Sequence, residues 1–261
     1  ERHVLDGVAG IEYQKGRTTD ADIQGIGFPS NKFKKLVSAT NIEDANSSGT
    51  EFAFASYFAR ANYKLDDKYL FGASFRVDGS SRFGRNNRYG SFPAVSAGWI
   101  ISEENFLKNS NTISFLKFRA SYGKTGNAEI GNFASLSLFS ATDYANIPGL
   151  VTTQIGVPDL SWENTTQLDL GIDFGFFDNR LTGEIDYFNK KTTDLMLNAP
   201  IPAVLGFTTI TKNIGSMNNT GWEFVLNGAI LRGTFTWTAS VNVSTYRNVV
   251  TKLVSPVPPS Q

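Results

Sequence analysis

Acidic side chains between residues 168 and 187 form the most unusual chemical grouping in the chain: Asp169, Asp173, Glu184 and Asp186. A two-residue turn at Asp178-Asn179 would place Asp173 directly opposite Glu184 on the next strand. Like charges in such a pair repel each other unless water, a metal ion or a basic side chain compensates them. Carboxylate oxygens suit a hard cation. A hydrated wall that Lys117 and Arg119 can reach explains the same residues, and we favour it.

The segment Asp78–Gly84, with the sequence DGSSRFG, contains two serines that could act as nucleophiles. A serine nucleophile needs a neighbouring base, and His3 is the only histidine in the chain. We therefore expect a structural role, in which Asp78 and Arg82 tie a strand to its loop and the glycines permit turns. The chain also has no cysteine, which excludes thiol nucleophiles and thiolate metal sites. We predict neither an enzyme nor a cofactor.

Aromatic residues outside the clearest strands could stack on sugar rings or on the side chains of a peptide. Loops carry much of the binding function of proteins, although a loop aromatic often serves local packing alone. The candidates for contact with a bound sugar or peptide are Tyr144, Trp162, Phe207 and Tyr246.

Composition excludes several classes of protein. Lysine plus arginine and aspartate plus glutamate both number 24, so no basic excess favours nucleic acid as a partner. Charged residues make up 18% of the chain, below the roughly 25% of ordinary soluble domains. No apolar run reaches the roughly 18 residues that a membrane helix needs. A helical membrane protein is therefore excluded, but much of the surface is expected to face something other than water.

Alternation of apolar and polar residues recurs in segments of roughly ten residues, the length of a tilted membrane strand. It predicts about nine strands, at 55–65, 69–78, 116–123, 168–176, 181–187, 222–230 and 235–244, with weaker candidates at 3–13 and 92–102. Large apolar residues of one parity should be exposed to membrane lipid: Tyr57, Phe71, Phe75, Leu170, Ile172, Phe224 and Val241. Charged residues of the other parity should face a lumen on the concave side: Arg60, Arg76, Asp78, Lys117, Arg119, Asp169, Asp173, Glu184, Asp186 and Glu223.

Connections between the predicted strands alternate between short and long. Tight turns are expected at Asp66-Asp67, Asp178-Asn179 and Arg232-Gly233, and a single helical turn capped by Ser102 at 102–108. Long irregular loops are expected at 14–50, 79–91, 124–161 and 192–215. Short turns on one rim and long loops on the other are typical of an all-β, antiparallel meander barrel in the outer membrane. A soluble sandwich or barrel is the alternative, and would bury the apolar parity.

Several residue strings follow one another at defined spacings: DDKYL at 66–70, RVDGSSRFG at 76–84, YGSFPA at 89–94, LKFR at 116–119, LSWE at 160–163 and NIGSMNNTGWE at 213–223. In this order they resemble the SusC/RagA family of TonB-dependent outer-membrane importers. The resemblance extends from residue 50 to residue 253 and is specific, because so many strings keep the family's spacing.

This resemblance implies a bacterial outer-membrane barrel of about 22 strands that is plugged by an N-terminal domain and driven through the TonB complex. It also implies a SusD-like surface lipoprotein as a lid, and glycans or peptides as cargo. We expect residues 1–261 to be a fragment of the barrel domain, without the plug and the final strands, and stable only within the parent barrel. A passive or structural barrel without energy coupling remains the alternative function.

Overall fold

The computed structural model describes residues 2–145 and 147–253, and most of these residues lie in strands. The strands are β1 (His3–Ile26), β2 (Asn41–Leu65), β3 (Tyr69–Ser80), β4 (Tyr89–Ile100), β5 (Ile113–Asn127), β6 (Leu138–Tyr144), β7 (Ile147–Gln154), β8 (Glu163–Phe176), β9 (Leu181–Pro200), β10 (Thr209–Leu231) and β11 (Trp237–Lys252). Three short 3₁₀ helices are η1 (Leu36–Ser38), η2 (Ile101–Glu103) and η3 (Ala203–Leu205). Across these residues, no helix has the length and apolar character to span a membrane. Residues 254–261, after which we expected the final strands of the barrel to be missing, lie outside the described residues.

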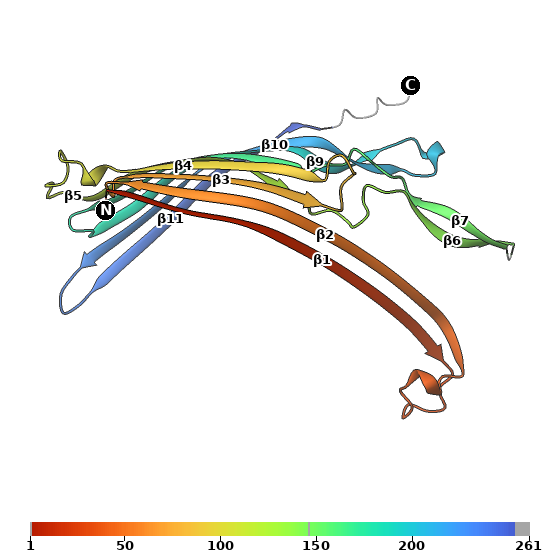
Figure 1. Ribbon diagram of the computed structural model, residues 1–261. Coiled ribbons are helices and arrows are strands. Elements are labelled where there is room, and N and C mark those ends of the chain that lie inside the picture. The colour runs from red at the N-terminus through yellow and green to blue at the C-terminus, as the bar shows by residue number, and fades with distance from the viewer. Residues whose placement is uncertain (1, 146, 254–261) are drawn as a thin grey trace, which may run out of the picture.

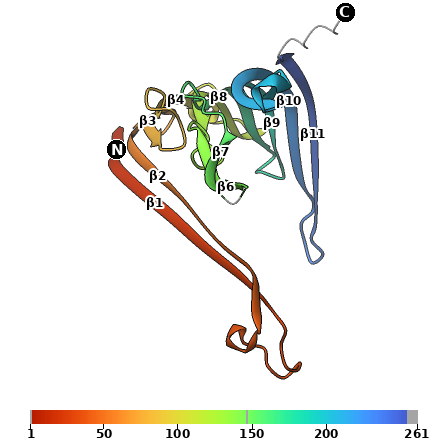
Figure 2. The ribbon, with the colours of Figure 1, turned by 90° about the vertical axis from the view of Figure 1, so that its right-hand side faces the viewer.

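In the described residues, nine strands form one antiparallel sheet in the order β1-β2-β3-β4-β5-β8-β9-β10-β11, so that strands next to each other along the chain pair, except that β5 pairs with β8. The remaining two strands, β6 and β7, form a separate hairpin between β5 and β8. Figure 2 shows the sheet as an arch, with β1 at one foot and β11 at the other. The predicted curved meander is therefore confirmed.

The large apolar residues of the sheet are not enclosed by a second layer. Six of the seven predicted lipid-facing residues are between 40% and 57% exposed: Tyr57, Phe71, Phe75, Ile172, Phe224 and Val241. Leu170, the seventh, is half-buried. A soluble sandwich would have buried these side chains, whereas a bilayer would cover them in place of a protein core. The exposure therefore contradicts the soluble alternative.

The short-turn rim follows the predicted chemistry at two of its turns. Asp66 and Asp67 have φ angles of 51° and 55°, and Asp178 and Asn179 have 54° and 56°, a region that Asp and Asn tolerate better than most residues. Both turns are confirmed.

The helical turn at 102–108 differs from the prediction. It begins one residue earlier, as η2, and no side chain caps it. Ser102 is buried inside the turn, so its predicted role as N-cap is wrong. The carboxylate of Glu104 anchors this turn instead, because it accepts hydrogen bonds from the Tyr69 hydroxyl at 2.6 Å and the Trp99 indole at 3.1 Å.

The long-loop side contains much more strand than the sequence pattern indicated. β1 and β2 stay paired as far as Ile26 and Asn41, so most of the loop predicted at 14–50 is a long hairpin. β9 and β10 likewise remain paired up to Pro200 and Thr209. Outside a bilayer, both faces of a strand meet water, so backbone pairing continues without the alternation that reveals it in the sequence.

Segments far apart in the sequence build a small core at the loop end of the sheet. Phe83, Phe92, Ala128, Leu160 and Trp162 are buried together, with Phe54 and Met196 packed against them. The five buried residues come from β4 and from the connections β3–β4, β5–β6 and β7–β8, whereas Phe54 and Met196 lie in β2 and β9. The core therefore fixes three loops against the sheet.

Candidate functional site: the charged face of the sheet

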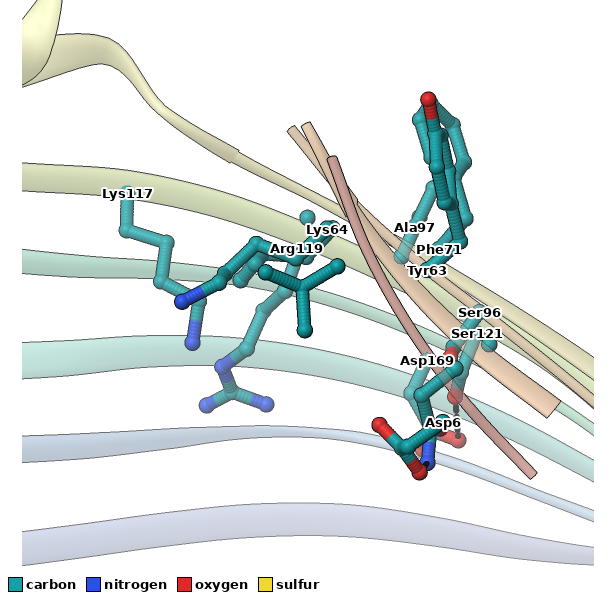
Figure 3. Close-up of a pocket in the computed structure, with 16 residues that line it drawn as sticks. Asp6, Tyr63, Lys64, Phe71, Ser96, Ala97, Lys117, Arg119, Ser121 and Asp169 are labelled. Atoms are coloured by element: carbon teal, nitrogen blue, oxygen red, sulfur yellow. Dashed lines mark hydrogen bonds between the residues drawn. The ribbon is translucent and has the colours of Figure 1, made fainter. Parts of the chain in front are cut away.

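Strand register places the ten predicted charged residues on one side of the sheet, here called the charged face. One row across it runs from Asp6 through Asn62, Gly72, Ser96 and Ser121 to Asp169. A second row joins Arg119 to Gly171, Asp186 and Glu223. Directly paired residues share a face. Figure 3 shows Asp6, Asp169, Lys117 and Arg119 on one side of the ribbon and Tyr63 and Phe71 on the other.

A hollow of about 560 Å³ lies on the charged face between β1 and β8. Small residues line its floor, including Gly72, Ser96 and Gly98, while Asp6 and Arg119 stand at its sides. This hollow was not predicted from the sequence. The sequence feature that could have predicted it is the run of small residues at the polar positions of adjacent strands. A search for alternating apolar and charged residues does not detect this run.

Arg119 is the centre of the acidic grouping. Its Nε donates to Asp173 Oδ1 at 2.9 Å, and its Nη2 lies 2.7 Å from the Asp186 carboxylate and 3.8 Å from that of Glu184. Lys117 Nζ lies 3.3 Å from the other oxygen of Asp173. Asp173 does sit directly opposite Glu184, as predicted, and the predicted approach of both basic residues is confirmed. Ion pairs therefore compensate the like charges.

Gly171 gives the Arg119 guanidinium its room. It is the direct cross-strand partner of Arg119, and a Cβ at this position would lie 2.6 Å from Arg119 Cζ. Any side chain there would push the guanidinium away from the sheet. The glycine thus lets Arg119 lie flat across β8 and reach the acids of β9.

The remaining charged residues make smaller groupings. Asp169 accepts hydrogen bonds from Ser121 Oγ at 3.1 Å and from Gln167 Nε2 at 2.7 Å. Arg76 pairs with Asp78 at 2.9 Å. Arg60 donates to Asn62 Oδ1 at 3.2 Å, and Glu223 is exposed. Among the described residues, no cluster of three or more acidic or histidine side chains has the arrangement of a metal site.

The segment Asp78–Gly84 is structural, but not entirely in the predicted way. Arg82 does tie its strand to a loop, donating to Asn132 Oδ1 at 2.9 Å and to the Ala128 carbonyl at 3.1 Å. Asp78 instead binds Arg76 on its own strand, so its predicted loop contact is wrong. Gly84 is needed for close approach and not for a turn, because a Cβ there would lie 2.6 Å from the Pro158 carbonyl carbon.

The four aromatic candidates occupy different environments. Trp162 is 7% exposed and donates its indole N–H to the Arg88 carbonyl at 2.9 Å, so its prediction as a cargo contact is wrong. Tyr246 was predicted in a loop but lies in β11 opposite Gly221, on the charged face. Tyr144 is 84% exposed at the end of β6, and Phe207 is half-buried before β10. Trp162 is buried by residues from distant loops, and such burial leaves no pattern in the local sequence.

A curved, single-layered antiparallel sheet with an apolar face exposed and a charged face opposite defines the wall of a transmembrane β-barrel. The family model described as TonB dependent receptor-like, beta-barrel matches residues 3–261, and the chain belongs to this family. Membership places the chain in the barrel of a bacterial outer-membrane protein.

Individual relatives sharpen this assignment. The TonB-dependent receptor SusC of Bacteroides thetaiotaomicron is 44% identical over 214 residues, which cover 78% of this chain and 21% of that protein. TonB-dependent receptor P39 of Formosa agariphila is 41% identical over 257 residues, covering 97% of this chain and 25% of that protein. The RagAB peptide importer in its closed-closed state superposes with a TM-score of 0.92 at 35% identity, covering 98% of this chain and 29% of that one. The chain is thus of the SusC/RagA type and spans about a quarter of the relatives' length.

Proposed function

We propose that the chain is part of the barrel wall of an active importer that takes glycans or peptides across the outer membrane with energy delivered through TonB. The observation that carries the proposal is the likeness to the RagAB peptide importer over 98% of the chain. SusC, among the relatives, is named a TonB-dependent receptor. The partners that follow are a SusD-like surface lipoprotein and the TonB complex, which would act through a part of the protein outside residues 1–261.

The charged face is the proposed lumen wall, in contact with a plug domain and with the solute path. Two features support this assignment. The face lies opposite the exposed apolar residues, so lipid on one side leaves the other for water. Its charges are largely paired at half-exposed positions, as at Arg119 and Asp173, which a hydrated wall permits at modest cost.

Cargo contacts are proposed at Tyr144, Phe207 and Tyr246, with Trp162 withdrawn. Tyr144 and Tyr246 are 84% and 77% exposed, and Tyr246 lies on the charged face, so its ring can meet a solute inside the barrel. Replacing each by alanine in the intact importer should weaken uptake without changing the amount of assembled protein.

Uptake by cells that carry the full-length gene tests the function. Cells should accumulate labelled oligosaccharides or peptides in a manner that depends on this gene, and accumulation should stop when TonB is deleted or the proton gradient is collapsed. Uptake that persists without TonB would instead support the passive barrel. Failure to accumulate either class of cargo, with the protein assembled in the membrane, would contradict import as a function.

A further inference from the structure

Three basic residues lie on the side of the sheet opposite the charged face, which carries Ile172 and Val241 and is here called the apolar face. These residues, here called the basic trio, are Lys124 on β5, Lys191 on β9 and Arg247 on β11. Both lysines pair directly with Thr166 of β8. Thr166 is an even number of residues from Ile172, and Arg247 is an even number from Val241, without a bulge between them. Since side chains alternate along a strand, the whole trio is on the apolar face.

The basic trio stands at one height on the barrel wall. At the short-turn end β5 begins with Ile113, β9 with Leu181 and β11 with Trp237, and each basic residue comes ten or eleven residues further along its strand. A tilted strand of about 9–11 residues spans the apolar core of a membrane. Figure 1 shows the β6–β7 hairpin at the long-loop end of the sheet, opposite the turn between β10 and β11. Because long loops are extracellular, the trio lies at the outer border of the membrane core.

The charge on this part of the apolar face has one sign. From the trio to the short-turn end, the apolar face of β5 and of β8–β11 has no other charged residue. In the described part of the chain no member of the trio forms an ion pair. Asp194, the next acid beyond the trio along β9, accepts hydrogen bonds from Asn164 and Thr193 instead. Anionic headgroups at the membrane surface would compensate these charges.

The spacing within the trio suits a phosphorylated headgroup. Paired strands are about 4.8 Å apart, so Lys124 and Lys191, with β8 between them, start about 10 Å apart and their long side chains can converge on one anion. Thr166 between the two lysines and Asn218 beside Lys191 add a hydroxyl and an amide as further donors. On the membrane side of Asn218, Trp222 is 47% exposed and can pack against acyl chains. Phosphate contacts and acyl-chain contacts thus adjoin on one surface.

We propose that the basic trio binds the phosphate groups of the glycolipid that forms the outer leaflet of the bacterial outer membrane. Lys124, Lys191 and Arg247 contact the phosphates, and the apolar face beneath them contacts the acyl chains of the same molecule. A free phosphate ion would use only the first of these two contacts, so the membrane lipid is the favoured source of the anion. The site is on the outer surface of the barrel and does not depend on the cargo of the proposed importer.

The test measures binding of lipid A, the bisphosphorylated membrane anchor of that glycolipid, to the purified full-length protein. Native mass spectrometry in detergent, at increasing concentrations of lipid A, gives an apparent Kd. Each basic residue near an anionic lipid surface strengthens binding by roughly fivefold. Replacing the whole trio by glutamine (Lys124→Gln, Lys191→Gln, Arg247→Gln) should therefore raise the Kd on the order of a hundredfold.

A matched control removes three exposed basic residues that lie on the charged face or on the short-turn side: Lys108→Gln, Lys190→Gln and Arg232→Gln. This control should bind lipid A as the wild type does. Equal amounts of heat-modifiable, assembled barrel establish that both variants fold. If the trio variant fails to assemble, single exchanges of Lys191 and Lys190 compare neighbouring lysines on opposite faces of β9, and only the exchange of Lys191 should raise the Kd, by about fivefold.

Two further ligands identify what the trio recognises. Lipid A without its phosphates should bind equally to the wild type and to the trio variant, since it has only acyl-chain contacts to lose. Inorganic phosphate at the same concentration should not displace lipid A. An unchanged Kd in the trio variant, or an equal rise in the trio variant and the control, would overturn the proposal. Displacement by inorganic phosphate would overturn the lipid as the ligand and assign the trio to a free anion.

Discussion

Replacing Arg119 by methionine should destabilise the barrel, because it leaves three acids on two adjacent strands with only Lys117 nearby. A charge-assisted hydrogen bond contributes roughly 1.5–3 kcal/mol, but the Arg119 side chain is 35% exposed, so water weakens each bond. Taking about 1 kcal/mol for each of the bonds to Asp173 and Asp186, we expect the free energy of unfolding to fall by about 2 kcal/mol. Urea titration of the full-length barrel, followed by its heat-modifiable mobility on gels, measures this loss.

Two controls separate charge from packing at Arg119. About 1 M NaCl shortens the Debye length to about 3 Å and should restore part of the loss, since it screens repulsion among the acids. In a background of Asp173→Asn and Asp186→Asn, the same arginine replacement should cost less than about 0.5 kcal/mol. An equal cost in both backgrounds would refute the ion-pair reasoning and leave contact with Gly171 as the role of the side chain.

Three further changes have defined outcomes. Ile172→Arg should cost about 2–4 kcal/mol near the bilayer midplane, and urea unfolding in liposomes that shows less than about 0.5 kcal/mol would mean that this face does not meet lipid. Asp173→Asn with Glu184→Gln should preserve assembly and alter uptake through the loss of the exposed Glu184 charge, whereas unchanged uptake would show that both acids belong to a hydrated wall. Hydrogen bonds from Tyr69 and Trp99 and the charge of Lys68 hold the pKa of Glu104 below its ordinary value. The ionised carboxylate therefore stabilises the folded protein at pH values above the pKa of the unfolded chain. This stabilisation is lost as the pH falls through the lower pKa of the folded state. Relative to Glu104→Gln, the wild type should therefore lose stability in acid, as refolding yields below pH 4.5 can measure.

The membrane-spanning part of the sheet could be predicted because two different solvents act on its two faces. Lipid on one side and water on the other impose the alternation seen at Phe71, Phe75 and Arg76, and a tight turn then fixes the partner of Asp173. The neighbours of Arg119 were predicted as well, since the meander places β5 beside β8 across the loop expected at 124–161, but the β6–β7 hairpin within that loop was not predicted. Meander topology with a long insertion was compatible with the sequence, but nothing local in it specified the pairing register.

Outside the membrane the same reasoning fails for a physical reason. Beyond the pair Gln14–Phe54, the β1–β2 hairpin meets water on both faces, so pairing is held by backbone hydrogen bonds that leave no residue pattern. Trp162 depends on Phe83 and Phe92, which reach it from other segments. Loop aromatics therefore need tertiary information before they can be divided into packing and binding residues.

The acids around Arg119 on the charged face are of two kinds, and only one kind is free to interact with the proposed plug or with a solute. The side chains of Asp173 and Asp186 are each 20% exposed and form ion pairs with Arg119, which neutralises their charge within the wall. Glu184 is 55% exposed at 3.8 Å from the same arginine, and Glu223 is exposed beside Asp186 in the register. Glu223→Gln should accordingly change uptake while the unfolding free energy moves by less than about 0.5 kcal/mol, whereas Asp186→Asn should do the reverse. A Glu223 variant that unfolds more easily and transports normally would show that this acid, too, belongs to the wall.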